Sequence, residues 1–126
     1  TDTRFREQHW GRWVGKTVRQ IQLDDGPELD KQIHAGWDFC PPGGESRLGV
    51  LKRSRAALAD AAQRYPGETI LVVCHEGVVK SLVYDLYGRK FLPDEPAILK
   101  SYQLHWLVIG SSGLQVEQIN ALNLGS

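Results

Sequence analysis

The stretch Thr69-Ile70-Leu71-Val72-Val73-Cys74-His75-Glu76-Gly77 decides the fold, because it has the pattern of an apolar strand that leads through a histidine into a glycine turn. Its apolar residues do not alternate with polar ones, and Gly67 and Gly77 bound the segment. Such a run is typical of a strand that is buried on both faces in a parallel sheet covered by helices. We therefore predict an α/β fold built around this strand.

His75 stands at the carboxyl end of the predicted strand, and ligands in open α/β sheets bind beyond that end. The residues that follow, 78–87, have the composition of a helix. The first amides of a helix have no partners within it, and they lie at the positive end of the helix dipole. The turn at His75 therefore predicts an anion site and points to phosphate chemistry.

The composition indicates one ordinary globular domain over residues 1–126, with 41% hydrophobic residues. Fifteen basic residues balance fifteen acidic ones, so we expect no nucleic-acid partner and no anionic membrane surface. No apolar run approaches the roughly 18 residues of a membrane-spanning helix. Cys40 and Cys74 have neither metal-ligand spacing nor a disulfide framework, which predicts free thiols, no metal and a cytoplasmic location.

The first third of the chain predicts a loop followed by two short helices. Residues 1–15 mix aromatic and charged residues without a period, which indicates an ordered loop. Thr17 and Gln20 have capping-box spacing and begin a helix that ends near residue 23. A second helix is predicted over 28–35.

The rest of the chain predicts a shaped loop, a long helix and a terminal hairpin. Two prolines and two glycines exclude regular structure over 37–44. Ser46 can cap the longest helix, which ends before the Tyr65-Pro66-Gly67 turn. Residues 101–109 and 114–119, joined by a Gly-Ser-Ser-Gly turn, predict an antiparallel hairpin at a sheet edge.

The beginning of the chain predicts a truncated protein. The chain has no methionine at all, and it opens on Thr1. Only the strand before His75 has the pattern of a fully buried parallel strand, and such a strand needs a neighbour on each side. We therefore expect one neighbour to lie outside these residues.

Three motifs occur in order along the chain: Phe5-Arg6-Glu7-Gln8-His9-Trp10-Gly11-Arg12-Trp13-Val14-Gly15, Pro41-Pro42-Gly43-Gly44-Glu45-Ser46 and Val73-Cys74-His75-Glu76-Gly77. Together they resemble the histidine phosphatase superfamily, which includes the phosphoglycerate mutases. The resemblance extends from Thr1 to about Leu86. It implies a three-layer α/β/α fold with a mostly parallel sheet, to which the terminal hairpin would add an antiparallel edge.

The resemblance also implies the roles of the site residues. In that family a histidine within an Arg-His-Gly motif attacks the phosphoryl group and becomes phosphohistidine. His75 matches the family's second histidine, which binds the phosphate together with arginines. Glu7 matches the proton donor for the leaving oxygen, a role that suits a general acid. Trp10 matches an aromatic residue near the substrate, and the amides of Glu76 and Gly77 match the phosphate position.

The chain departs from the family pattern because it contains no Arg-His-Gly. It resembles the C-terminal two thirds of a family member, either as a fragment or as a diverged short relative. We expect the isolated chain to be inactive, because the nucleophile is missing. We also expect it to be poorly soluble, because one side of the buried strand would be open to pairing.

Several other polar residues are expected to have structural or solvent-facing roles. His9, His34 and His105 are not expected to replace the nucleophile. Glu45 and Ser46 lack the Gly-x-Ser-x-Gly surroundings of a nucleophile elbow and are expected to cap the long helix. We expect Arg53 and Arg55 to be solvated and Trp13 to be core, and Arg4 is a further candidate for contact with phosphate.

The sequence therefore predicts a phosphomonoester hydrolase that acts on a small phosphorylated metabolite without metal or nucleotide cofactor. The short connection between Gly15 and Pro41 favours a phosphatase over a cofactor-dependent phosphoglycerate mutase, which carries a longer insertion there. The stretch 37–46 is similar to α-ribazole phosphatases and broad-specificity phosphatases. The alternatives are a mutase, an inert phosphate-binding module that lost its nucleophile, and a structural domain without either property.

Overall fold

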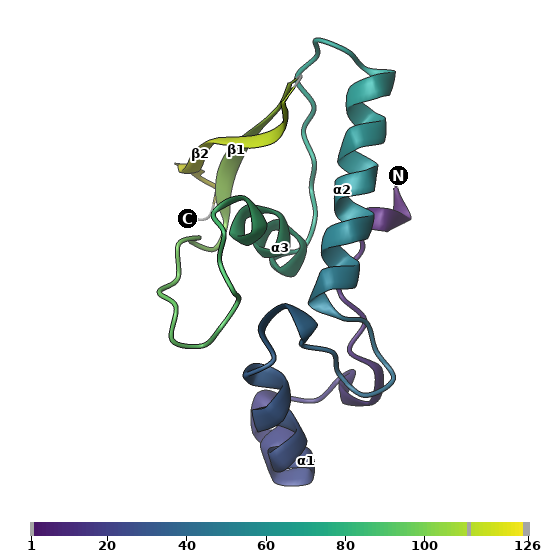
Figure 1. The fold of residues 1–126 in the computed structure, drawn as a ribbon, viewed down its shortest axis with the longest axis vertical. Helices are drawn as coiled ribbons and strands as arrows, with labels where there is room; N and C mark the ends of the chain where they lie inside the picture. Colours follow the sequence, from purple (N-terminus) through teal and green to yellow (C-terminus); the bar gives the residue numbers. More distant parts are fainter. Residues whose placement is uncertain (1, 111, 125–126) are drawn as a thin grey trace.

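The computed structural model describes residues 2–110 and 112–124. Over these residues the chain is α/β, with three α-helices and one antiparallel pair of strands (Figure 1). The helices are α1 (Val18–Ile33), α2 (Arg47–Arg64) and α3 (Glu76–Leu86). The strands are β1 (Gln103–Gly110) and β2 (Gly113–Asn123). Three single-turn 3-10 helices lie in the connections: η1 (Thr3–Phe5), η2 (Gly11–Trp13) and η3 (Gly36–Asp38).

The molecule is elongated, with α1 at one end and the β1–β2 hairpin toward the other (Figure 1). Helix α2 runs lengthwise along one side, and η1 packs against it. Helix α3 packs against both α2 and β2, so it lies in the middle of the structure. It therefore connects the long helix to the hairpin.

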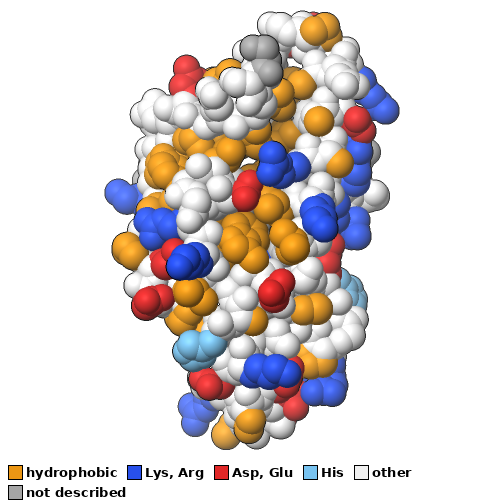
Figure 2. Space-filling view, in the orientation of Figure 1, with side chains coloured by type: hydrophobic (Ala, Val, Ile, Leu, Met, Phe, Trp, Pro, Cys, Tyr) orange, Lys and Arg blue, Asp and Glu red, His pale blue; other side chains and the backbone are white. Residues whose placement is uncertain are grey.

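The segment 69–75 corrects the central prediction of the sequence. It is extended, but it forms no strand with any described residue. Leu71 is 74% exposed and Val73 is 86% exposed, so the prediction of burial on both faces was wrong. A strand needs a neighbour to hydrogen-bond its backbone, and the described residues form only an antiparallel hairpin, not the predicted parallel sheet. Figure 2 shows apolar side chains gathered on the face where this segment and the hairpin lie.

The helix boundaries follow local capping signals. The Thr17 hydroxyl accepts from the Gln20 amide at 3.1 Å and the Gln20 side chain accepts from the Thr17 amide at 2.8 Å, which confirms the capping box. The two predicted helices are joined into α1 across a kink at Asp25, and Pro27 follows this kink. Proline is tolerated there because the first turn after the kink needs no amide donor at that position.

The other two α-helices also begin at recognisable caps. The Ser46 hydroxyl accepts from the Gly49 amide at 3.0 Å, which confirms Ser46 as the cap of α2. Helix α3 begins two residues earlier than predicted, because the residue after His75 already has helical geometry. The predicted hairpin is confirmed and is longer than expected, with register shifts on either side of Trp106.

Buried apolar side chains form three clusters, one beside α1, one between α2 and α3, and one between α3 and the hairpin. Their members are Trp13, Ile21, Leu29 and Phe39 in the first; Val50, Leu51, Val78 and Leu82 in the second; and Val83, Tyr84 and Leu99 in the third. Trp13 is 1% exposed, which confirms it as a core residue.

Arg47 joins the α1 end of the molecule to the loop that follows α3. Its guanidinium carbon lies 4.3 Å from the ring centroid of Phe39 and 4.0 Å from that of Phe91. It also donates to the carbonyl oxygens of Gly36, at 3.1 Å, and Phe91, at 3.2 Å. Burial lowers the pKa of Arg47 to about 10, so the side chain stays charged at neutral pH.

Cys40 and Cys74 are free thiols, as the sequence predicts. Among residues 2–110 and 112–124, no α-helix is long and apolar enough to cross a bilayer.

The loop that follows Gln8 packs tightly on the proline–glycine loop before α2. The Glu45 amide donates to the His9 carbonyl at 2.8 Å, and the Arg12 amide donates to the Pro42 carbonyl at 2.8 Å. Gly11 has a φ of +53°, and a Cβ there would overlap the Pro42 carbonyl oxygen. Only glycine fits this contact without moving one of the two loops.

We predict that Gly11→Ala destabilises the chain by about 3 kcal/mol or more, because it combines backbone strain with a steric overlap. Gly15→Ala is the matched control, since Gly15 has a φ of +76° but open space around it. We expect this control to lower the free energy of unfolding by about 1 kcal/mol, through backbone strain alone. Urea unfolding followed by tryptophan fluorescence measures both. Equal losses in the two variants would show that the loop contact has no energetic role.

Candidate active site

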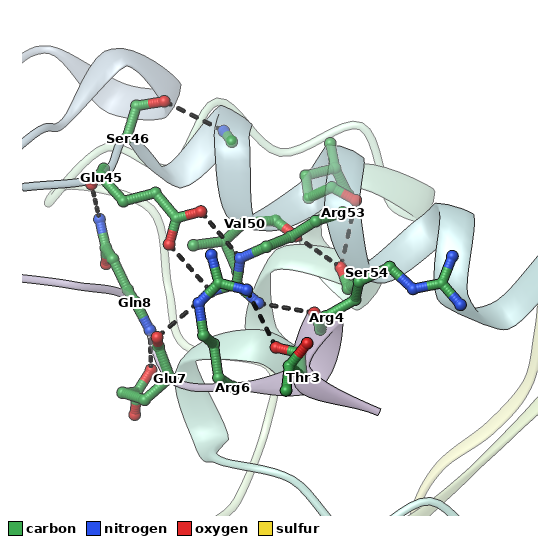
Figure 3. A network of polar contacts seen from close by, with 12 residues as sticks. Thr3, Arg4, Arg6, Glu7, Gln8, Glu45, Ser46, Val50, Arg53 and Ser54 are labelled. Atoms are coloured by element: carbon green, nitrogen blue, oxygen red, sulfur yellow. Dashed lines mark hydrogen bonds and ion pairs between the residues drawn. The ribbon is translucent and has the colours of Figure 1, made fainter. Parts of the chain in front are cut away.

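A network of polar contacts fixes the loop that carries Glu7 onto α2 (Figure 3). Arg53 of α2 donates through Nε to Glu45 Oε2 at 2.8 Å and through Nη2 to Glu45 Oε1 at 2.9 Å. The same guanidinium donates to the carbonyl oxygen of Arg4 at 2.6 Å and to that of Glu7 at 3.2 Å. The side chain of Arg53 is 12% exposed and that of Glu45 is 20% exposed. One guanidinium of α2 therefore binds both the residue before the cap of α2 and the loop 4–7.

Gln8 adds a second connection between the same loop and the start of α2. Its side-chain amide donates to the Glu45 carbonyl at 2.8 Å, and its backbone amide donates to Glu7 Oε1 at 2.9 Å. Arg4 is engaged elsewhere, because its guanidinium pairs with Asp2 at 2.7 Å and Asp60 at 2.6 Å. The structure therefore places Arg4 in a surface ion-pair cluster beside α2.

The Glu7 carboxylate lies against the first turn of α3. A Cβ built on Gly77 would lie 2.8 Å from Glu7 Oε1, so the carboxylate occupies the space that a larger residue would fill. Burial raises the pKa of the Cys74 thiol, and the negative charge of Glu7 raises it further. Glu7 therefore approaches residues on both sides of His75, although it lies 68 positions earlier in the sequence.

His75 is the N-cap residue of α3 and is exposed. No side chain among the described residues caps this helix, and helix geometry leaves the amides of Glu76 and Gly77 without intrahelical partners. The Glu76 carboxylate accepts a bond from the Ser101 hydroxyl at 3.3 Å, which draws it toward the hairpin. The turn thus presents an imidazole and two backbone amides, a combination suited to an anion.

Trp10 lies in the wall of a hollow of about 450 Å³. Its ring packs on Phe39, with 5.4 Å between the centroids, and is 6.3 Å from Trp13. Glu7 lines the same hollow, whereas His75 does not. The structure therefore places the Glu7 carboxylate against Gly77 and also in the lining of the hollow that contains Trp10.

The other histidines are placed as follows. His9 lines the hollow, and its Nδ1 accepts from the Gly11 amide at 3.1 Å. His34 is the C-cap of α1, and its Nδ1 lies 2.8 Å from the Asp30 carbonyl. His105 lies on β1, where burial lowers its pKa.

The environment of Arg53 differs from the one predicted from the sequence. We expected it to be solvated, but it is largely buried and paired with Glu45. A signal was present: Arg53 follows Val50 by three positions and precedes Ala57 by four, and both of these residues face the core. Helical spacing therefore places Arg53 at the edge of the buried stripe of α2.

No group of three or more His, Cys, Asp or Glu side chains within residues 2–110 and 112–124 is arranged to hold a metal ion. The groups that the site does offer are a carboxylate, an imidazole and helix-terminal amides.

Comparison with known proteins identifies the class. The family model of the histidine phosphatase superfamily (branch 1) matches residues 1–122, so this chain belongs to that superfamily.

The chain is similar to several phosphatases within that class. It is 32% identical over 121 residues to glucosyl-3-phosphoglycerate phosphatase of Mycobacterium tuberculosis. This alignment covers 89% of this chain and 48% of the relative. The solved structure of YhfR from Bacillus stearothermophilus matches with a TM-score of 0.81 and 27% identity, over 94% of this chain and 59% of that one. The α-ribazole phosphatase of Shigella flexneri has a TM-score of 0.73 at 18% identity over 99% of this chain and 62% of that one, which shows a shared fold. The chain spans about half the length of the curated relative.

We predict that Glu45→Gln destabilises the chain by about 2 kcal/mol at pH 7, because it leaves the Arg53 charge largely buried and unpaired. Arg53 lowers the pKa of Glu45, so the pair stabilises the fold above the usual glutamate pKa. That contribution is lost as the pH falls through the lowered value in the folded state. Urea unfolding at pH 7 and at progressively lower pH measures this effect. The difference in free energy of unfolding between the parent chain and Glu45→Gln should become smaller as the pH falls.

Glu68→Gln is the control, since Glu68 is an exposed loop residue. It should leave both the stability and its pH dependence unchanged. A gap between the parent chain and Glu45→Gln that stays constant down to acid pH would contradict the assigned role of the ion pair.

Proposed function

We propose that this chain carries half of the active site of a phosphomonoester hydrolase that acts through phosphohistidine. The observation that carries the proposal is the position of the Glu7 carboxylate against Gly77, beside the turn at His75. In this proposal Glu7 is the general acid and base, and His75 and the amides of Glu76 and Gly77 bind the phosphate. Trp10 contacts the substrate on the far side of Glu7.

The proposed reaction has two steps. First, a histidine nitrogen attacks phosphorus, the bond from phosphorus to the alcohol oxygen breaks, and Glu7 gives its proton to that oxygen. Second, water attacks the phosphohistidine while Glu7 takes a proton from it, which releases inorganic phosphate and restores the histidine. The imidazole of His75 and the helix-terminal amides stabilise the charge on the equatorial oxygens in both steps.

The nucleophile of the proposed reaction lies outside these 126 residues, which contain no Arg-His-Gly. We place it on a strand that precedes residue 1 and pairs with the exposed segment 69–75, giving the mostly parallel, three-layer sheet that the sequence predicts. Two observations support this placement. The chain covers 48% of its curated relative, and the apolar side chains of Leu71 and Val73 are exposed.

The substrate in this proposal is a small phosphorylated metabolite, as the names of the relatives suggest. The short connection between Gly15 and Pro41 favours hydrolysis over the mutase reaction. The free thiols of Cys40 and Cys74 support a cytoplasmic location. The second candidate is an inert phosphate-binding module, which the absence of Arg-His-Gly from the sequence favours.

We predict that, in a polypeptide extended to carry the Arg-His-Gly segment, Glu7→Gln and His75→Ala each lower kcat for p-nitrophenyl phosphate. The expected loss is roughly 100-fold or more, because each variant removes a group that acts in the transition state. Phosphate release measures the effect. Glu117→Gln on β2 and His34→Ala at the end of α1 are the matched controls and should retain full turnover.

The 126-residue chain alone provides the baseline, and we expect negligible release from it. Turnover by the isolated chain would refute the assignment of the nucleophile to another segment. Phosphate binding without release by the extended polypeptide would favour the inert module. Full activity in both Glu7→Gln and His75→Ala would rule out the proposed site.

We predict that Gly77→Ala in the extended polypeptide lowers kcat while leaving the fold intact. The new methyl group would displace only the flexible end of the Glu7 side chain, and a shift of about 1 Å in a catalytic group can reduce the rate by roughly 100-fold. Gly49→Ala in the first turn of α2 is the comparison, because its nearest side-chain neighbours, Glu45 and Ser46, lie at 3.3 Å. Unchanged kcat in Gly77→Ala would show that Glu7 does not act from the position seen here.

A further inference from the structure

The hollow beside Trp10 is formed by three segments that meet near α1. It is lined by the loop 6–10, by residues 13–16 at the end of η2, and by Val18 and Ile21 of α1. Its volume of about 450 Å³ lies within the range of small-molecule sites. The proposed function so far uses only two of its residues, Glu7 and Trp10.

The walls of the hollow are mainly apolar, and part of this apolar surface faces solvent. Val14 and Val18 are each 60% exposed, and the Trp10 ring lies beside them. Of the two lysine and arginine side chains in the lining, one is paired with a carboxylate and the other donates to a neutral carbonyl. Lys16 Nζ pairs with Asp24 at 3.1 Å, and an Arg6 Nη atom donates to the Thr3 carbonyl at 3.0 Å.

This arrangement favours an apolar occupant over a second anion. A second phosphate or a carboxylate would have to compete with Asp24 for Lys16. A flat apolar group would instead cover Val14, Val18 and the Trp10 ring, removing apolar surface from water.

Glu7 determines which part of a substrate reaches the hollow. Its carboxylate borders Gly77 in the proposed phosphate site and also lines the hollow. The atom that Glu7 protonates is the bridging oxygen between phosphorus and the alcohol. With the phosphoryl group at α3, the alcohol half therefore extends from Glu7 toward Trp10 and Val18.

We propose that the hollow binds the alcohol half of the substrate, and that this half is an aryl or comparably bulky apolar group. The proposal rests on the proposed function for its direction, since the phosphate site defines which end of the substrate faces Glu7. It adds a substrate class, namely monophosphates of apolar alcohols, and it argues against sugar phosphates and bisphosphates.

The test is a titration of the dilute ¹⁵N-labelled chain with four probes: 1-naphthol, 1-naphthyl phosphate, glucose 6-phosphate and inorganic phosphate. The Trp10 indole N–H signal, identified with Trp10→Phe, reports on the hollow. The amides of Glu76 and Gly77 report on the phosphate site. We expect both naphthyl compounds to shift the Trp10 signal, with a Kd for 1-naphthyl phosphate about tenfold below that for glucose 6-phosphate.

Val18→Asp should abolish the shift at Trp10 and leave the response of Glu76 and Gly77 to inorganic phosphate unchanged. Leu23→Asp is the matched control, because Leu23 is 77% exposed on the same helix and does not line the hollow. Val14→Ser is a second, milder variant of the wall and should weaken naphthyl binding in the same direction.

The outcomes separate the two proposals. If neither naphthyl compound shifts Trp10, or if glucose 6-phosphate binds as tightly as 1-naphthyl phosphate, the substrate class is wrong, whatever inorganic phosphate does. If inorganic phosphate leaves Glu76 and Gly77 unshifted while the naphthyl compounds still shift Trp10, the phosphate site fails and the apolar site remains.

Discussion

The ion pair between Arg53 and Glu45 is the interaction on which the arrangement of the site depends. Its guanidinium binds a carboxylate at the start of α2 and, at the same time, two carbonyl oxygens of the loop that precedes Gln8. The pair is largely buried, so its hydrogen bonds are not shared with water as those of a surface pair would be. Glu7 reaches the N-terminus of α3 because Arg53 holds its backbone on α2, while Phe5 of the same loop packs on the cluster between α2 and α3.

The structure shows which sequence signals are sufficient on their own. The caps at Thr17 and Ser46 and the terminal hairpin were predicted correctly, because each depends on contacts between residues near one another in the sequence. The segment 69–75 was predicted wrongly. Its apolar pattern shows that its side chains can be buried, but not that they are buried. Whether it is buried depends on a neighbour that the described residues do not supply.

For the candidate site, the structure bears on the positions of the residues, while their roles stay predictions. The order of the three motifs indicated that Glu7 and the turn at His75 belong together, and the contact of Glu7 with Gly77 agrees with that expectation. Arg53 was missed because an arginine on an amphipathic helix is usually solvated, and its partner Glu45 lies before the helix begins. The hollow was not predictable, because its walls come from three segments that are brought together by tertiary contacts such as the packing of Trp10 against Phe39.

Cys74 adds a property to the site that does not depend on the reaction itself. Its thiol lies immediately before His75, and both burial and the charge of Glu7 raise its pKa. Peroxides and disulfides react with the thiolate, so a thiol that stays protonated at neutral pH resists oxidation. At Cys74, burial first and the charge of Glu7 second therefore favour the protonated thiol, so the site combines an exposed imidazole with a cysteine that is disfavoured as a thiolate.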